Sequence, residues 1–194
     1  MDIYTRKGDD GTTGLLYGGR VRKDDPRPVA YGDVDEAQAA IGVARAHAAA
    51  SVPGGAHVAD TTDELVELLV GIERDLWVVM AELATAPGNR HKLSAGTSLV
   101  TSDMVDALET TIDDVVGRFD APREFVVPGE TVVGAHLDVA RTVVRRAERG
   151  ALSAVEDGSH AGAYLNRLSD LLWALARWQE GTSRTTRSVD PASP

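Results

Sequence analysis

Apolar residues recur every three or four positions in five separate stretches of this chain, which is the spacing of one buried face of an α-helix. The stretches span residues 30–50, 60–85, 101–118, 131–155 and 161–180. The second stretch is the most regular, and a run of Asp and Thr at its start suits the N-terminal cap of a helix. Its periodic apolar residues are Leu65, Leu69, Ile72, Leu76, Val79 and Leu83.

Segments rich in glycine, proline or polar residues flank these stretches. Glycines, followed by Pro26 and Pro28, punctuate residues 1–29, which predicts a long N-terminal loop before the first helix. Residues 181–194 are polar with little to bury, which predicts a flexible tail. The chain is dominated by alanine, valine and leucine, and its 194 residues suffice for one core. The sequence therefore predicts an all-α, five-helix bundle in one domain over residues 1–180.

The chain carries a formal net charge of -10. We expect no binding to nucleic acid or to an anionic membrane, because both demand a broad basic field. Cysteine is absent, which excludes disulfides, thiolate catalysis and cysteine metal sites. The N-terminus lacks the apolar core of a signal peptide and no apolar run approaches a membrane span, so we expect a cytoplasmic protein.

Residues 140–149 read ARTVVRRAER and reverse the acidic charge locally. On a helix four of their five charged side chains share one face, while two valines and Ala147 turn toward the core. Such a face either offers planar donors for bidentate phosphate recognition or forms an ion-pair network with neighbouring acids. The residues of this charged face are Arg141, Arg145, Glu148 and Arg149.

Residues 5–13 read TRKGDDGTT. Glycines let backbone amides turn toward an anion, the threonine hydroxyls add donors, and Arg6 and Lys7 add positive charge. Asp9 or Asp10 suits a water-mediated contact with a magnesium ion. The segment therefore suits a triphosphate, although Gly-Asp-Asp-Gly is also ordinary turn chemistry. It is not a Walker A loop, because no GKS or GKT follows it.

Polar residues in two other predicted helices are also candidates. Asp33 lies in the predicted first turns of a helix, where an acid complements the helix dipole. Asp35, two residues later, is suited to anchor an arginine across an interface. Asn166 is a poor helix former in a leucine stripe, which favours a buried or ligand-facing role. The five histidines show no metal-ligand spacing, and no glutamate opens an ExxH pair, which disfavours a di-iron bundle.

Together these segments give the chain a specific resemblance. It resembles the ATP:cob(I)alamin adenosyltransferases of the propanediol-utilisation type. The motifs that carry the resemblance are TRKGDDGTT at 5–13, YGDVDE at 31–36, PGE at 128–130, DVARTVVRRAER at 138–149 and YLNRLSDLLWALAR at 164–177.

This resemblance implies a five-helix bundle that assembles as a homotrimer, with each active site at a subunit interface. It implies that ATP lies between the N-terminal loop and the RRAER helix, that Asp35 and Arg141 form an ion pair across the interface, and that Phe125 packs beneath the corrin ring. The residues that it carries into the ATP site are Thr5, Arg6, Lys7, Gly8, Asp9, Gly11, Thr12, Thr13, Lys23, Arg145, Glu148, Arg149 and Asn166.

The implied reaction is attack of Co(I) of cob(I)alamin on the 5′-carbon of ATP, which releases triphosphate and forms adenosylcobalamin. Because Co(I) is the nucleophile, no protein base is needed. The resemblance assigns catalysis to Arg145, Arg141 and Asp35, which position the substrates and stabilise charge, with Mg²⁺ bound through the ATP phosphates. Phe125 would exclude the lower axial ligand and so favour reduction of Co(II). A reductase and an adenosylcobalamin-dependent mutase are the implied partners.

Two other functions stay open on the sequence. The trimer would serve as an adenosylcobalamin carrier with little turnover, or as a structural all-α oligomer in which the arginine face is an ion-pair network. Lys23 and Asn166 argue against the structural alternative, because ion pairing alone would not require them.

Three positions depart from the family's pattern. Asp138 stands where the family has histidine, with a histidine displaced to His136; Glu130 replaces the second glycine of PGG; and Ala37 replaces a hydrophobic residue. Asp138 lies three residues before Arg141, so we expect it to compete with Asp35 for that arginine.

Overall fold

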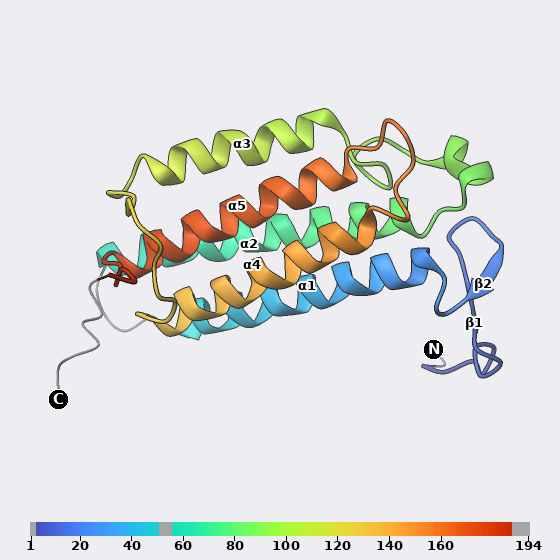
Figure 1. Ribbon diagram of the computed structural model, residues 1–194, viewed down its shortest axis with the longest axis horizontal. Coiled ribbons are helices and arrows are strands. Elements are labelled where there is room, and N and C mark those ends of the chain that lie inside the picture. The colour runs from blue at the N-terminus through green and yellow to red at the C-terminus, as the bar shows by residue number, and fades with distance from the viewer. Residues whose placement is uncertain (1–2, 51–55, 188–194) are drawn as a thin grey trace.

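The computed structural model describes residues 3–50 and 56–187, and it confirms the predicted all-α bundle (Figure 1). A short antiparallel hairpin precedes the first helix, with Thr12 opposite Arg22 and Gly14 opposite Arg20. The elements are β1 (Thr12–Gly14), β2 (Arg20–Arg22), α1 (Pro26–Ala50), α2 (Ala56–Leu83), the 3-10 helix η1 (Pro87–Lys92), α3 (Ser102–Val116), α4 (Val132–Ala151) and α5 (Ala161–Glu180).

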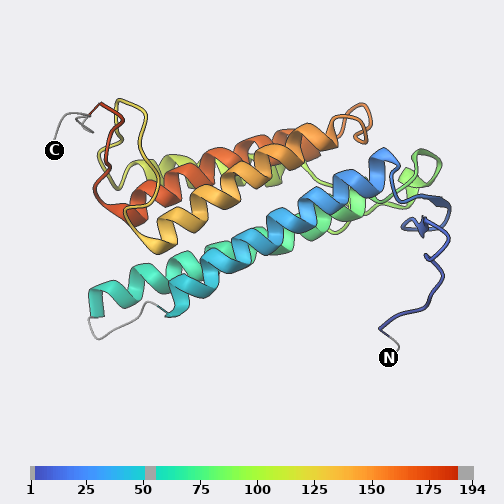
Figure 2. The same ribbon diagram turned by 60° about the horizontal axis from the view of Figure 1, so that its bottom comes forward.

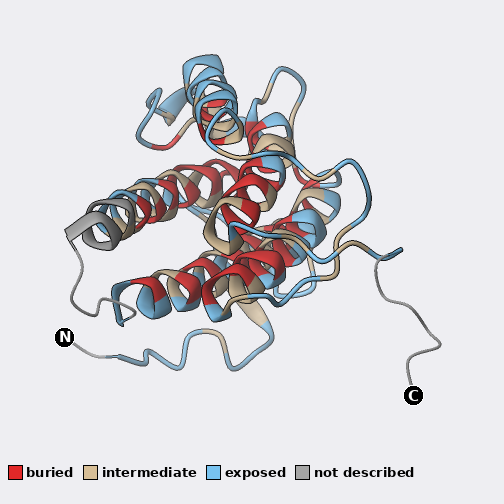
Figure 3. Cartoon of the chain, turned by 90° about the vertical axis from the view of Figure 1, so that its left-hand side faces the viewer, coloured by how far each residue is buried: buried red, intermediate tan, exposed pale blue. Residues whose placement is uncertain are grey.

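Helix α4 packs between α1 and α5, while α2 packs on α1 and α3 packs on α5. The buried residues of the helices face one another across the bundle, and the exposed residues face outward (Figure 3). Burial of one leucine side chain stabilises a fold by about 1.5–3 kcal/mol, so the central leucine-rich helix α5 is a major source of stability. Its buried apolar residues are Ala161, Tyr164, Leu165, Leu168, Leu171, Leu172, Ala174, Leu175 and Ala176.

The first helix begins earlier than the sequence predicted. We expected its start at residue 30, after two prolines, but Pro26 and Pro28 both lie in its first turn. The first N–H groups of a helix have no intrahelical acceptor, so proline costs little there and its φ suits the helix. Asp33 therefore lies beyond the first turn, and the prediction that it complements the helix dipole was wrong.

Residues 181–187 run beside the segment that precedes α4. Val126 and Thr185 form an antiparallel bridge, and the N–H of Val127 donates to the carbonyl of Arg184 at 2.8 Å. The rest of the predicted tail, residues 188–194, lies outside the described residues. Within the described residues, no helix is both long and apolar enough to span a membrane.

Candidate active site

Helix α4 exposes the charged face that the sequence predicted. Val144 and Ala147 are fully buried on one side, whereas Arg145 and Arg149 are exposed on the other. Arg149 Nη1 donates to the carbonyl oxygen of Arg145 at 2.9 Å. Neither arginine forms an ion pair with any residue that the structure describes, although their neighbours do. Two guanidinium groups on one helix face thus remain available to an anion.

The neighbouring Arg146 has a structural role instead. It forms ion pairs with Glu36 and, at 3.9 Å, with Asp33 of α1, and the hydrogen bond that it donates to the Glu36 carboxylate raises the pKa of Arg146. Gly150 allows this close approach, because a Cβ there would lie 2.6 Å from Asp33 Oδ2. The ion-pair interpretation of the arginine helix therefore applies to the side that faces α1.

Glu148 of α4 and Asn166 of α5 are hydrogen-bonded to each other. Asn166 Nδ2 donates to Glu148 Oε1 at 2.9 Å, and Arg167 Nη1 donates to Asn166 Oδ1 at 2.6 Å. Both Glu148 and Asn166 are half-buried. The structure thus brings together two of the predicted ATP-site residues and fixes which way the amide of Asn166 points.

The N-terminal loop forms a compact turn around its glycines. The N–H of Lys23 donates to the carbonyl of Gly11 at 2.9 Å, and a Cβ added to Gly8 would lie 3.3 Å from Lys23 Nζ. Gly11 has a φ of 80°, in the left-handed region that glycine adopts readily. Lys23 is therefore placed over the loop, next to residues 5–13.

Arg20 is a member of this loop cluster that the sequence analysis missed. Its Nη2 donates to the carbonyl of Lys7 and to Thr12 Oγ1, both at 2.5 Å. Thr12 in turn donates its N–H and hydroxyl to Asp10, which lowers the pKa of that carboxyl. The hairpin creates this cluster, because it folds Arg20 back beside β1; the Gly18-Gly19 turn was the signal for it.

The loop and the arginine face of α4 lie apart in one chain. The loop extends beyond the N-terminal end of α1, while α4 lies on the other side of α1 (Figures 1 and 2). No hydrogen bond or ion pair joins residues 5–13 to α4 within the part of the chain that the structure describes. Asp35 is exposed on α1, and Arg141 Nε lies 3.0 Å from Asp138 Oδ1, so Arg141 has an intrachain partner.

Phe125 belongs to the connection between α3 and α4, and this connection lies at the opposite end of the bundle from the N-terminal loop (Figure 1). Its side chain is 87% exposed and borders a cavity of about 770 Å³. Val126, Pro128 and Trp173 give this cavity an apolar wall. Its charged lining residues are Arg123, Glu124, Asp138, Arg141, Arg177 and Arg187.

The carboxylates present fit a magnesium ion that is held mainly by phosphate oxygens. Within residues 3–50 and 56–187, no three His, Cys, Asp or Glu residues are grouped to hold a metal ion. Asp10 already accepts two hydrogen bonds from Thr12, while Asp9 is exposed in the same loop. Mg²⁺ commonly uses one or two carboxylates together with substrate phosphates and water, so Asp9 is the residue that would contribute.

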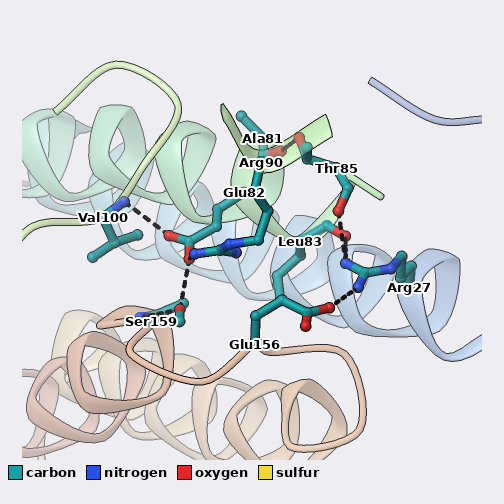
Figure 4. A network of polar contacts seen from close by, with 10 residues as sticks. Arg27, Ala81, Glu82, Leu83, Thr85, Arg90, Val100, Glu156 and Ser159 are labelled. Atoms are coloured by element: carbon teal, nitrogen blue, oxygen red, sulfur yellow. Dashed lines mark hydrogen bonds and ion pairs between the residues drawn. The ribbon is translucent and has the colours of Figure 1, made fainter. Parts of the chain in front are cut away.

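A buried polar network fixes the end of α2 that holds the hairpin (Figure 4). Glu82 is 2% exposed; its Oε2 accepts from the N–H of Val100 at 2.9 Å, and its Oε1 accepts from Ser159 Oγ at 2.6 Å and from Arg90 Nη2 at 3.0 Å. A buried carboxylate is tolerated when its oxygens are satisfied in this way. Sequence reasoning did not find Glu82.

Arg27 extends the network to the first helix. Its Nη1 donates to the carbonyls of Leu83 and Thr85 at 3.2 and 2.8 Å, which satisfies carbonyls at the end of α2, and its Nη2 pairs with Glu156. The N–H of Leu16, in the hairpin, donates to the carbonyl of Ala84 at 2.9 Å. The hairpin that carries the candidate nucleotide loop is therefore attached where this network is anchored.

A model of the cobalamin adenosyltransferase family matches residues 3–179, which include every helix and strand described above except the last residue of α5. The chain belongs to the cobalamin adenosyltransferase family. Among curated relatives of this adenosyltransferase, the corrinoid adenosyltransferase of Mycobacterium tuberculosis is 40% identical over 94% of this chain and 95% of its own length. The corrinoid adenosyltransferase PduO of Citrobacter freundii is 38% identical over 93% of this chain and 50% of its own length.

Solved structures agree with the fold of this adenosyltransferase. A variant of a PduO-type ATP:corrinoid adenosyltransferase from Lactobacillus reuteri, complexed with cobalamin and ATP, superposes with a TM-score of 0.80 and 30% identity, over 96% of this chain and 97% of that one. A second variant from that organism, complexed with ATP, has a TM-score of 0.78 and 29% identity, over 95% of this chain and 100% of that one.

Proposed function

We propose that this protein transfers the 5′-deoxyadenosyl group of ATP to Co(I) of a corrinoid. Its relatives are named corrinoid adenosyltransferases, and its structural neighbours bind cobalamin and ATP. The observation that carries the proposal is the pair Arg145 and Arg149, exposed and without an ion-pair partner among the described residues, beside the Glu148–Asn166 hydrogen bond. A face of this kind suits a polyphosphate.

The reaction needs positioning and charge stabilisation rather than a protein base. The electron pair of Co(I) forms the Co–C bond to the 5′-carbon as the C–O bond to the triphosphate breaks, and the triphosphate keeps that electron pair. Arg145 and Arg149 would stabilise the charge on the leaving group, and a magnesium ion held in part by Asp9 would neutralise more of that charge. Arg141 and Asp35 would orient the two sides of the site, as the resemblance implies.

The nucleotide site in this proposal has two halves. The N-terminal half supplies backbone amides, hydroxyls and cations, and the helical half supplies the two arginines with Glu148 and Asn166. The proposed contacts of the N-terminal half are Thr5, Arg6, Lys7, Gly8, Asp9, Gly11, Thr12, Thr13 and Lys23.

We infer that the two halves meet between subunits of a homotrimer. In one chain the loop extends away from α4, and it lies at the end of the bundle opposite the connection between α3 and α4 (Figure 1), the segment that contains Phe125. Helix α4 alone has 20 residues, a length of about 30 Å, so one chain does not bring the loop to Phe125. A second chain that presents its loop would complete the site, with Phe125 against the corrin ring.

A reductase that supplies reduced corrinoid and a mutase that accepts the product are the protein partners this reaction calls for.

The direct test is anaerobic incubation of the purified protein with cob(I)alamin and Mg-ATP. We expect the spectrum of adenosylcobalamin to develop with one triphosphate released per cobalt alkylated. Formation of ADP and phosphate, or no spectral change under strong reductant, would overturn the proposal.

A subunit-mixing experiment tests the shared site. Lys7→Glu impairs the loop half and Arg145→Ala impairs the helix half, and each variant alone is expected to lose about nine-tenths or more of its activity. If the halves come from different chains, mixed trimers regain intact sites in about one quarter of the positions, by random assembly at equal amounts. Mixtures that stay as inactive as the separate variants would mean that one chain supplies both halves.

A further inference from the structure

Asp138 joins two arginines in the interior of the bundle. Its Oδ1 lies 3.0 Å from Arg141 Nε, and its Oδ2 accepts from Arg177 Nη2. Asp138 is 4% exposed and Arg177 is 1% exposed, so both charges of this contact are removed from water. Asp138 of α4 and Arg177 of α5 therefore form a buried ion pair, and Arg141 extends it to the surface of the Phe125 cavity.

The ion pair continues to the segment that follows Phe125. Arg177 Nε lies 3.0 Å from Glu180 Oε2, an ion pair without the alignment of a hydrogen bond. Glu180 Oε1 accepts from the N–H groups of Gly129 and Glu130 at 3.4 and 3.3 Å. One chain of contacts thus runs from Asp138 to the turn at residues 129–130.

Gly134 of α4 leaves the space that this arrangement requires. A Cβ at Gly134 would lie 2.8 Å from Glu180 Cγ and 3.0 Å from Glu180 Oε1, closer than side chains pack. Glu180 therefore packs closely against α4 at Gly134, while its Oε1 accepts from the turn at residues 129–130. The side chain of Glu180 is fully buried.

The formal charges of this chain of contacts balance. Arg141 and Arg177 are positive, and Asp138 and Glu180 are negative. Loss of one member leaves the others buried without full compensation, which costs far more than loss of an exposed pair. Removal of the Asp138 carboxylate would leave two guanidinium groups facing each other, and Arg177 Nη1 already lacks a hydrogen-bond partner among the described residues.

We propose that Asp138 is a positioning residue that holds residues 125–130 in a fixed place relative to Arg141, and thereby controls how the corrinoid is held. The proposal rests on the adenosyltransferase function proposed above. Asp138 acts in two directions: it orients Arg141 at the cavity wall directly, and it orients residues 125–130 through Arg177 and Glu180. It does not itself contact the corrinoid in this proposal.

The test compares Asp138→Asn with the wild-type protein and with Asp106→Asn, which removes an exposed carboxylate from α3. Asp138→Asn should speed hydrogen exchange at the amides of Gly129 and Glu130 by about tenfold or more, because the buried contacts that order the turn are weakened. It should also raise KM for the corrinoid several-fold more than KM for ATP. In electron paramagnetic resonance it should weaken the signal of four-coordinate Co(II), the form of the corrinoid whose lower axial ligand is excluded. Asp106→Asn should change none of these.

Glu180→Gln reaches the same turn from the other end and provides a second variant if Asp138→Asn folds poorly. Both variants should produce the same corrinoid defect, and the double variant should add little to either alone, because the residues act through one network. A lower melting temperature with unchanged amide exchange at residues 129–130 and an unchanged ratio of the two KM values would overturn the inference and leave Asp138 a structural ion pair. Hydrogen exchange is measured without substrates and does not depend on turnover. The inference about Asp138 can therefore fail even if the wild-type protein is an active adenosyltransferase. Conversely, the effect of Asp138 on residues 129–130 can be observed even if the wild-type protein shows no turnover.

Discussion

Asn166 and Glu148 are linked by a 2.9 Å hydrogen bond across the contact between α5 and α4, next to the exposed Arg145 and Arg149. In this bond Asn166 is the donor and Glu148 is the acceptor. The bond therefore determines which polar groups of these two side chains remain for hydrogen bonds to a nucleotide. A glutamate beside two arginines also limits how far their charge attracts anions in general. The arrangement therefore favours a ligand that combines phosphates with hydrogen-bond donors, such as the hydroxyl groups of a ribose.

Asn166→Asp tests this arrangement. The substitution places a second carboxylate against Glu148 and removes the donor, so we expect KM for ATP to rise about tenfold or more while KM for the corrinoid changes little. Gln179→Glu adds the same charge to α5 away from Glu148 and serves as the control. Equal effects of the two substitutions on ATP would indicate a general charge effect rather than loss of this hydrogen bond.

Arg145 and Arg146 are adjacent in sequence and offer a matched pair. Arg145→Ala should reduce kcat/KM for ATP by about 10- to 100-fold with little change in melting temperature, because the side chain is exposed and has no ion pair among the described residues. Arg146→Ala should leave ATP kinetics nearly intact and cost at most about 1 kcal/mol of unfolding free energy, since its pairs with α1 are partly exposed. Steady-state kinetics and thermal unfolding separate the two. Impaired ATP kinetics in Arg146→Ala but not in Arg145→Ala would mean that Arg146, and not Arg145, binds the phosphates.

Phe125→Ala should separate the two redox states of the corrinoid. The side chain is 87% exposed, so its loss should not affect folding, but it should reduce turnover from Co(II) more than turnover from Co(I). The four-coordinate Co(II) signal should fall in parallel. Trp77→Ala, at another exposed aromatic residue on α2, is the control. Equal losses from both redox states would remove the role proposed for Phe125.

The elements of the fold could be predicted because their information is local. Helical periodicity alone placed Arg145 outward and Val144 inward, and it gave the five helices in order. The start of α1 was misplaced because proline was read as a break, whereas a first turn accepts it. Arg20 and Glu82 were missed because their surroundings arise from tertiary contacts. Glu82 is buried by segments up to 77 residues away in the sequence, and no pattern around residue 82 signals this.

Glu82→Gln tests whether the network of Figure 4 stabilises the end of the bundle. An amide has one acceptor oxygen in place of two, so at least one of the contacts from Val100, Ser159 and Arg90 is lost inside the protein. We expect a loss of about 2–4 kcal/mol of unfolding free energy by chemical denaturation. Glu67→Gln, at an exposed position of the same helix, should change stability by less than about 0.5 kcal/mol. A loss no larger than that of the control would mean that Glu82 is not held as described.

Asp75 gives a prediction for pH. Its carboxylate accepts from Tyr164 Oη at 3.0 Å, but partial burial dominates and raises the pKa of Asp75. A carboxyl with a raised pKa favours folding most when it is protonated, so its contribution declines as pH rises through the folded-state pKa. Asp75→Asn keeps an acceptor for Tyr164 and removes the charge. We therefore expect a higher melting temperature than wild type at pH 7, and a difference that shrinks as the pH falls toward about 4, below which Asp75 is mostly protonated in both states. A difference independent of pH would show that the charge of Asp75 is not its cause.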